Sequence, residues 1–220
     1  MLVLTLDNLS LIYDALYQAA IDQGWACWGG DQRMAQGVSQ LQRILSPHFV
    51  PKSGTALELG CGEGHLCRLL AAHGYRVTGV DISSVAIAWA KQKQPPSDTI
   101  HYLQSDIAAA DFTLDARFDL IIDGNCLHCV IGDRRAVFLK NIHTLLHEHG
   151  IVFISSLCSQ DADNHILLHQ NMPYRFIPTA HYIIVEMIAA GFSVLEHHVH
   201  RRDQINHINL FLKKTAAHHH

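Results

Sequence analysis

The sequence predicts an α/β fold: a seven-stranded, mostly parallel sheet with helices on both faces and an antiparallel hairpin at its C-terminal end. From about residue 55 onward, short buried-strand patterns alternate with amphipathic helical patterns. This alternation implies right-handed crossovers between parallel strands. The last two strand patterns are joined only by the polar turn RRDQ, which is too short for a crossover and therefore predicts antiparallel pairing.

The individual elements follow from the same periodicities and from glycine and proline breaks. Strands are expected at 55–60, 75–81, 100–106, 117–124, 151–157, 193–200 and 207–214. Helices are expected at 65–74, 84–93, 134–150 and 179–191, three of them ending in glycine. Two segments stand outside this alternation: residues 1–50 predict a helical N-terminal cap, and residues 158–178 predict a long irregular insertion that forms a lid. The core is thus expected over 51–217, and His218–His220 are expected to be a tag remnant.

Composition restricts the classes of partner. The 220 residues carry a formal net charge of -4 and no long Lys/Arg cluster, which disfavours a nucleic-acid partner. No apolar run approaches the roughly 18 residues of a membrane span, and the N-terminal segment lacks the basic region of a secretion signal. Six cysteines in a domain of this size predict reduced thiols and a cytoplasmic location.

The strongest local signal is ELGCGEG, residues 58–64, which lies between a predicted strand and a predicted helix. Glycines at such a turn let a ligand approach the backbone closely and direct the first helical N–H groups toward it. A dinucleotide fingerprint, G-x-G-x-x-G, would require glycine at position 65, where the chain has His65. Dinucleotide binding is therefore disfavoured.

The pattern E-x-G-x-G-x-G resembles the first motif of the class I S-adenosylmethionine-dependent methyltransferases. Asp81 ends the second strand, Asp106 ends the third, and FDLIIDG matches the fourth-strand motif of that family. The resemblance covers roughly residues 50–214. It implies a Rossmann-like core and S-adenosylmethionine as the cofactor.

The resemblance also implies which residues bind the cofactor: Glu58, Gly60, Cys61, Gly62, Gly64, Asp81, Ile82, Asp106, Ile107 and Asp123, with Arg33 at the cofactor carboxylate. In the family, the acid matching Asp81 binds the ribose hydroxyls and that matching Asp106 lies near the adenine amino group. The alternative for both acids is capping of the following helix. Glu58 orients the glycine turn, contacts the ligand's amino group or only bonds within the loop, while Arg33 is either a carboxylate ligand or solvated.

The segment DGNCLHC, Asp123–Cys129, follows the fourth strand, where ligands bind in open α/β sheets. The resemblance implies that it faces the transferable methyl group, with Asn125 and His128 holding the acceptor. His128 is the candidate catalytic base, and the alternative is a histidine that shapes the loop. The Cys126–Cys129 pair lacks the second ligand pair of a structural zinc site, so no metal is expected.

Aromatic residues outside the core pattern are candidates for binding the acceptor. Tyr17 and Trp28 lie in the predicted cap and Tyr174 lies in the insertion, and the alternative for the first two is ordinary packing. Together these features predict a methyltransferase for a small molecule, with the acceptor atom and the oligomeric state left open. The rival interpretations are a macromolecular acceptor, a nucleotide-cofactor oxidoreductase and a non-catalytic cofactor-binding module.

Overall fold

The computed structural model describes the backbone of residues 6–216, and the side chains of residues 6–8 and 31–33 lie outside the described part. The predicted tag remnant, residues 218–220, also lies outside it. The chain divides into two compact units, Met1–Ile107 and Ala108–His220, which are taken in turn below. The division into cap, core and lid stays a prediction.

The strands form a seven-stranded sheet in the order β3-β2-β1-β4-β5-β9-β8, and β6 and β7 form a separate two-stranded sheet. The sheet is mostly parallel and ends in an antiparallel C-terminal hairpin, and helices connect its parallel strands. This architecture confirms the predicted fold class.

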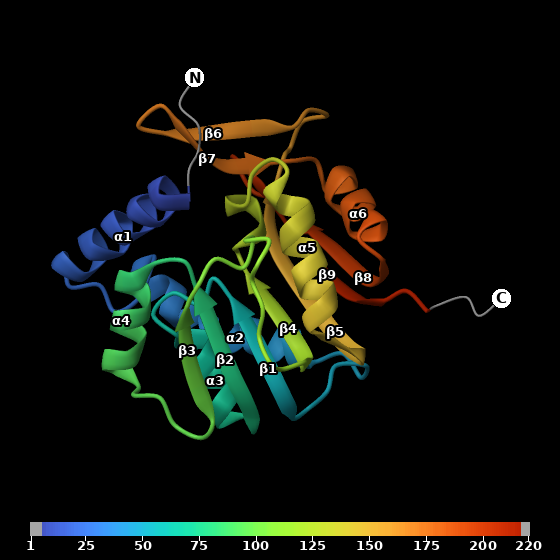
Figure 1. Cartoon of the computed structure of the whole chain (residues 1–220). Helices are drawn as coiled ribbons and strands as arrows, with labels where there is room; N and C mark the ends of the chain where they lie inside the picture. Colours follow the sequence, from blue (N-terminus) through green and yellow to red (C-terminus); the bar gives the residue numbers. More distant parts are fainter. Residues whose placement is uncertain (1–5, 217–220) are drawn as a thin grey trace. The chain divides into compact units, whose positions relative to one another are not determined.

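The first unit begins with two helices and continues as a parallel βαβαβ arrangement (Figure 1). Its elements are α1 (Leu6–Asp22), α2 (Gly30–Leu45), β1 (Gly54–Leu59), α3 (His65–Ala72), β2 (Tyr75–Asp81), α4 (Ser84–Lys93) and β3 (Ile100–Gln104). Strand β2 pairs in parallel with β1 on one side and β3 on the other. Helix α1 packs against α4, so the N-terminal segment contacts the βαβαβ core within the same unit.

The second unit combines one parallel strand pair with antiparallel pairs. Its elements are β4 (Phe118–Gly124), the 3-10 helix η1 (Leu127–Cys129), α5 (Arg134–Leu145), β5 (Leu146–Cys158), β6 (His165–His169), β7 (Met172–Ile177), α6 (Ala180–Ala189), β8 (Phe192–His200) and β9 (Asn206–Lys214). Strands β4 and β5 are parallel, whereas β9 pairs antiparallel with both β5 and β8. Strand β5 therefore changes the sheet from parallel to antiparallel pairing.

The prediction that the helix beginning at residue 134 extends to Gly150 was wrong. Helix α5 ends at Leu145, and β5 starts directly at Leu146, whose backbone pairs with Phe118 of β4. A Cβ at position 150 would lie 2.9 Å from the Phe118 carbonyl oxygen. Gly150 therefore permits a close approach between strands and does not end a helix.

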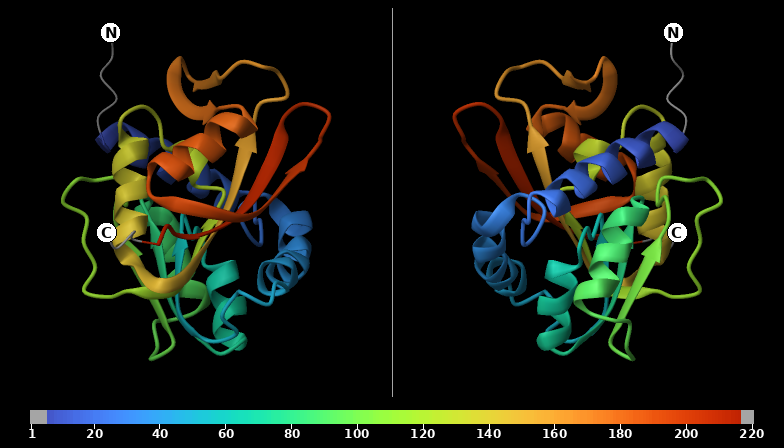
Figure 2. Two further views of the ribbon diagram at one scale, coloured as in Figure 1. Left: turned by 90° about the vertical axis from the view of Figure 1, so that its right-hand side faces the viewer. Right: turned by 90° about the vertical axis from the view of Figure 1, so that its left-hand side faces the viewer.

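The prediction that residues 158–178 are irregular was also wrong. Most of them form the β6–β7 hairpin, shown in orange in Figure 2. Its two-residue turn, Gln170 and Asn171, has φ angles of 49° and 62°. Two successive positive φ angles are typical of the type I′ turn that closes tight hairpins.

Among the described residues, no helix combines the length and the apolar character that crossing a membrane requires.

Candidate functional site

The glycine turn has the backbone geometry that its composition predicts. Gly60, Gly62 and Gly64 have φ angles of 65°, 56° and 75°, a region that side chains disfavour. The N–H of Cys61 donates to the Val80 carbonyl at 3.0 Å, which ties the turn to the end of β2. The turn is therefore held beside the strand that ends in Asp81.

Asp81 is brought directly against this turn. Its Oδ2 accepts the N–H of Gly62 at 2.8 Å, and its Oδ1 accepts the N–H of Ser83 at 2.9 Å. Burial raises the pKa of this carboxyl from 3.8 to about 6, although both hydrogen bonds lower it. The backbone N–H of Ile82 also lowers this pKa, and the roughly four acceptor sites of a carboxylate leave Asp81 capacity for a ligand hydroxyl.

Glu58 lies below the turn in an enclosed environment. It is 4% exposed, and its Oε2 accepts the Cys67 thiol at 2.8 Å. Desolvation raises its pKa to about 8, while the bond from Cys67 lowers it. Burial likewise raises the pKa of the Cys61 thiol to about 11, so this cysteine is protonated and unreactive. The side chain of Glu58 therefore bonds to α3, the helix that follows the turn, and its part in cofactor binding stays a prediction.

The ends of β2 and β3 lie together, which brings the second predicted acid toward the first. The N–H of Ser105 donates to the Asp81 carbonyl at 2.9 Å, and the Gln104 side chain donates to the Ile82 carbonyl at 3.2 Å. Asp106, which follows Ser105, is partly exposed, and Ile107 is buried. The carboxyl edges of both strands therefore carry an acid.

The two aromatic candidates of the N-terminal segment pack together. The rings of Tyr17 and Trp28 lie 4.8 Å apart, and Tyr17 belongs to a buried cluster with Trp89 of α4. A Cβ at position 62 would lie 2.8 Å from the Tyr17 hydroxyl, so Tyr17 reaches the glycine turn. Both packing and contact with the turn are therefore present. Arg33 lies in α2, but its side chain is outside the described part of the chain.

In the second unit, Asp123 organises the turn that carries the other predicted residues. Its carboxylate accepts the N–H of Cys126 at 2.5 Å and that of Leu127 at 2.9 Å, and the side chain is fully buried. Burial raises its pKa to about 7, against the lowering effect of these hydrogen bonds and of Arg135. Its observed contacts are with the protein's own turn.

Asn125 and His128 are each held by partners that the sequence did not indicate. Asn125 has a φ of 86°, and its Oδ1 lies 2.7 Å from Nε2 of His207 on β9. His128 is 3% exposed, and its Nδ1 accepts the N–H of Leu157 at 3.4 Å. That bond favours the neutral form with the proton on Nε2, which suits a loop-shaping histidine better than a base.

Arg135 is a buried residue that sequence analysis missed. Its Nη1 donates to the carbonyls of Leu127 and Val130 at 2.7 and 3.0 Å, one at each end of the turn around His128. Its Nε and Nη2 form a bidentate ion pair with Glu186 of α6 at 2.7 and 2.6 Å. The sequence offered no signal, because an arginine in the first turn of a helix normally points to solvent.

Tyr174 lies on the β6–β7 hairpin, where the guanidinium of Arg175 lies 4.8 Å from its ring centre.

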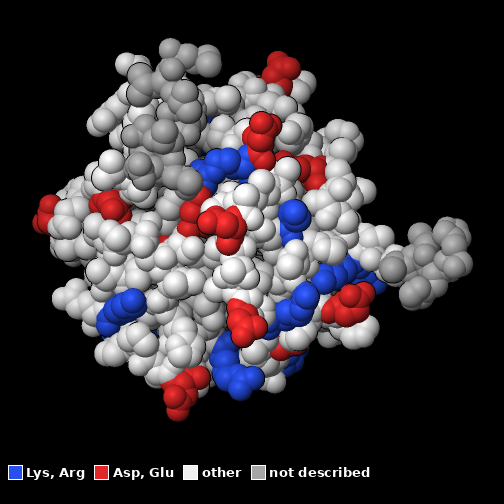
Figure 3. All heavy atoms as spheres, in the orientation of Figure 1, with Lys and Arg blue, Asp and Glu red and all other residues white. Residues whose placement is uncertain are grey.

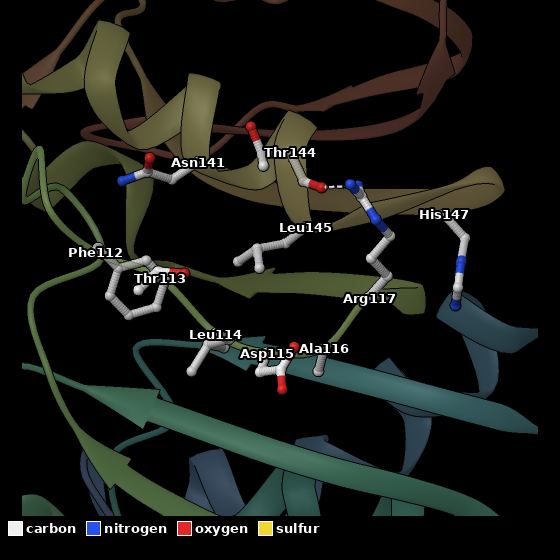
Figure 4. A pocket seen from close by; sticks show the side chains of 10 residues that line it. All are labelled: Phe112, Thr113, Leu114, Asp115, Ala116, Arg117, Asn141, Thr144, Leu145 and His147. Atoms are coloured by element: carbon white, nitrogen blue, oxygen red, sulfur yellow. Dashed lines mark hydrogen bonds between the residues drawn. The ribbon is translucent and has the colours of Figure 1, made fainter.

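The second unit also contains a pocket of about 390 Å³, shown in Figure 4. Residues from the loop before β4, from α5 and from β5 line it, including Phe112, Arg117 and Asn141. None of its lining residues belongs to the predicted site.

Comparison with known proteins identifies the central segment. The family model described as a methyltransferase domain matches residues 57–154, which include the glycine turn, Asp81 and the Asp123 turn. The chain carries a class I S-adenosylmethionine-dependent methyltransferase domain. The predicted family, enzyme class and cofactor are thereby confirmed at the level of this domain.

Two relatives illustrate the range of proteins with similar domains. The chain is 37% identical over 117 residues to a ubiquinone biosynthesis O-methyltransferase of Coxiella burnetii, covering 52% of this chain and 48% of that protein. It is 30% identical over 133 residues to the mouse eEF1A lysine and N-terminal methyltransferase, covering 58% of this chain but 19% of the relative. The chain thus spans less than half of either relative.

A crystal structure of the Burkholderia thailandensis 1,6-didemethyltoxoflavin-N1-methyltransferase has a similar fold, with a TM-score of 0.75. That structure contains bound 1,6-didemethyltoxoflavin and S-adenosylhomocysteine. The alignment covers 98% of this chain and 93% of that protein at 20% identity. The likeness therefore concerns the fold, and it extends beyond the segment matched by the family model.

Proposed function

We propose that the chain transfers the methyl group of S-adenosylmethionine to a small-molecule acceptor. The observation that carries the proposal is the likeness over 98% of the chain to a methyltransferase with 1,6-didemethyltoxoflavin and S-adenosylhomocysteine bound. Because that alignment reaches well outside residues 57–154, it includes the N-terminal and C-terminal segments as well as the methyltransferase domain. The ubiquinone-biosynthesis relative supports the same class of acceptor.

The residues of the first unit fit this cofactor. The glycine turn has no side chains at Gly60, Gly62 and Gly64, which permits a ligand to approach its backbone closely. Asp81 offers a carboxylate with acceptor capacity beyond its backbone hydrogen bonds, which suits a ribose diol, and Asp106 follows the next strand. We propose these residues for cofactor binding, together with Glu58 as support of the turn.

The cofactor, when bound, supplies a methyl group on a positively charged sulfur that is open to in-line displacement. The protein's contribution is to align the acceptor and to exclude water. We propose acceptor contacts at Tyr17, Trp28, Asn125 and Tyr174. A base is needed only where the acceptor must lose a proton, and the Nδ1 contact of His128 supports the loop-shaping role over that of a base.

A protein acceptor is the second candidate, because one relative is a lysine and N-terminal methyltransferase.

The charge distribution supports the small-molecule proposal over a nucleic-acid acceptor. The chain has a net charge of -4, and acidic and basic side chains lie beside one another on the face in Figure 3. A nucleic-acid partner requires a basic surface.

A methylation screen tests the proposal. Purified protein and labelled S-adenosylmethionine would be incubated with small phenols, amines, thiols and nitrogen heterocycles, and in parallel with a protein extract and with total RNA. Mass detection of a methylated small molecule, absent from an Asp81→Asn control, is the expected result. Label found only in protein or RNA would refute the small-molecule proposal, and no binding of S-adenosylhomocysteine in calorimetry would refute methyl transfer altogether.

A further inference from the structure

A second carboxylate, that of Asp14, is connected to Asp81 by contacts that no local sequence pattern indicated. Asp14 of α1 accepts hydrogen bonds from the hydroxyl groups of Ser83 at 2.5 Å and Ser84 at 3.1 Å. It also accepts the N–H of Val85 at 3.2 Å. These groups begin α4, where the first N–H groups of a helix lack partners within the helix. Asp14 therefore caps α4 from a separate helix.

Ser83 connects this cap to the predicted ribose-binding acid. Its N–H donates to Asp81 Oδ1 at 2.9 Å, its hydroxyl donates to Asp14, and its Oγ accepts the N–H of Ala86 at 3.0 Å. The residue is completely buried, so water does not replace a lost partner. The Ser83 hydroxyl thus acts as donor and acceptor at once, and loss of Asp14 would remove its acceptor.

The two carboxylates also interact through charge. The negative charge of Asp14 adds to burial in raising the pKa of Asp81, whereas the N–H groups of Ser83 and Gly62 lower it. Glu58 is the other acid whose charge couples to Asp81, together with the Cys61 thiol. Removing the Asp14 charge therefore has two separable effects: it frees Ser83, and it makes Asp81 easier to ionise.

We propose that Asp14 is a positioning residue for cofactor binding: through Ser83 it sets the direction in which the Asp81 carboxylate meets the ribose of S-adenosylmethionine. The inference rests on the ribose-binding role proposed for Asp81. It assigns Asp14 no contact with the cofactor. A cap that acts only on the stability of α4 would affect the melting temperature but leave the cofactor affinity of the folded protein unchanged, and this difference makes the proposal testable.

Calorimetric titration with S-adenosylhomocysteine between pH 5 and 8.5 provides the test. Asp14→Asn is expected to weaken binding at pH 7.5 by about fivefold to tenfold, the effect of losing one charged helix cap. The acid limb, the range in which binding is lost as pH falls, is expected to move to lower pH because Asp81 then ionises more readily. Asp14→Glu retains the charge but changes the reach, so it is expected to weaken binding without moving the acid limb.

Asp22→Asn is the matched control, because Asp22 is an exposed acid of the same helix whose carboxylate accepts the Gln18 side-chain amide at 2.8 Å. It is expected to bind within about twofold of wild type with an unmoved acid limb. Thermal melts verify that each variant folds, and if Asp14→Asn does not, Asp14→Glu alone decides the affinity. Wild-type affinity and an unmoved acid limb in Asp14→Asn, or equal shifts in Asp22→Asn, would overturn the inference.

Asp81→Asn separates this inference from the proposal on which it rests. If that variant binds S-adenosylhomocysteine as tightly as wild type, the role of Asp81 is wrong and the inference is overturned with it. If wild type itself does not bind, the proposed function fails. Weakened binding in Asp81→Asn with unaffected binding in Asp14→Asn would overturn only the role of Asp14.

Discussion

Replacing Glu58 by glutamine tests how strongly burial acts on the acids of the candidate site. The pKa of Glu58 is raised from its ordinary 4.5 to about 8, chiefly by desolvation. A carboxyl whose pKa is higher in the folded than in the unfolded chain contributes stability below its unfolded pKa, and this contribution is lost as pH rises through the folded value. At about 1.4 kcal/mol per pH unit the full loss is roughly 5 kcal/mol, and relaxation of the buried site reduces it to about 2–3 kcal/mol.

Glutamine retains an oxygen for the Cys67 thiol but does not ionise. We therefore expect the free energy of unfolding of Glu58→Gln, relative to wild type, to rise by about 2–3 kcal/mol between pH 5 and pH 8.5. Urea unfolding without cofactor at four pH values in this range measures it. Glu196→Gln changes an exposed acid, and its free energy of unfolding should change with pH as that of wild type does. The same pH dependence in Glu58→Gln as in wild type would refute the reasoning.

Three further predictions concern the two turns. Gly62→Ala is expected to weaken S-adenosylhomocysteine binding at least about tenfold in calorimetry, because position 62 has a φ of 56° and its Cβ would lie 2.8 Å from the Tyr17 hydroxyl. Arg135→Met is expected to lower the free energy of unfolding by about 3–5 kcal/mol in urea titrations, and Arg135→Met with Glu186→Met by clearly less, since the double change leaves no unpaired buried charge. His128→Ala is expected to preserve cofactor affinity and to lower turnover by less than about tenfold, as measured with the acceptor that the screen identifies.

Each of these predictions has an outcome that contradicts it. Gly24→Ala is the control for Gly62→Ala, because Gly24 has a φ of 70° but open space around its Cβ position. Equal binding by Gly62→Ala and wild type would show that the turn tolerates a side chain. A double variant no more stable than Arg135→Met would contradict the unpaired-charge explanation. A fall in turnover of 100-fold or more in His128→Ala would establish the base.

Local patterns predicted the first unit well. The helix at 84–93 and the strand at 75–81 appear with the expected bounds, because each is delimited by its own sequence signals. The second unit was predicted less well where strand pairing decided the structure. Residues 146–150 continue a helical pattern, yet pairing with β4 draws them into β5. The β6–β7 turn escaped prediction because Gln170 is not a residue expected at positive φ.

The site shows the same limit. The sequence indicated the glycine turn and Asp81, because both belong to one βαβ pattern, but it did not indicate their supporting contacts. Asp14 and Ser83 are 69 residues apart, and Asn125 and His207 are 82 apart. Such contacts depend on tertiary packing and leave no periodic signal in a single sequence.

Three of the buried acids, Glu58, Asp81 and Asp123, also change what the sequence says about charge. The formal value of -4 counts every carboxyl as ionised. In the fold, Glu58, Asp81 and Asp123 have pKa values of about 8, 6 and 7, so at neutral pH Glu58 is mostly protonated and Asp123 partly so. The folded methyltransferase domain thus carries less negative charge at neutral pH than its sequence suggests. The formal charge describes the unfolded chain better than the folded one.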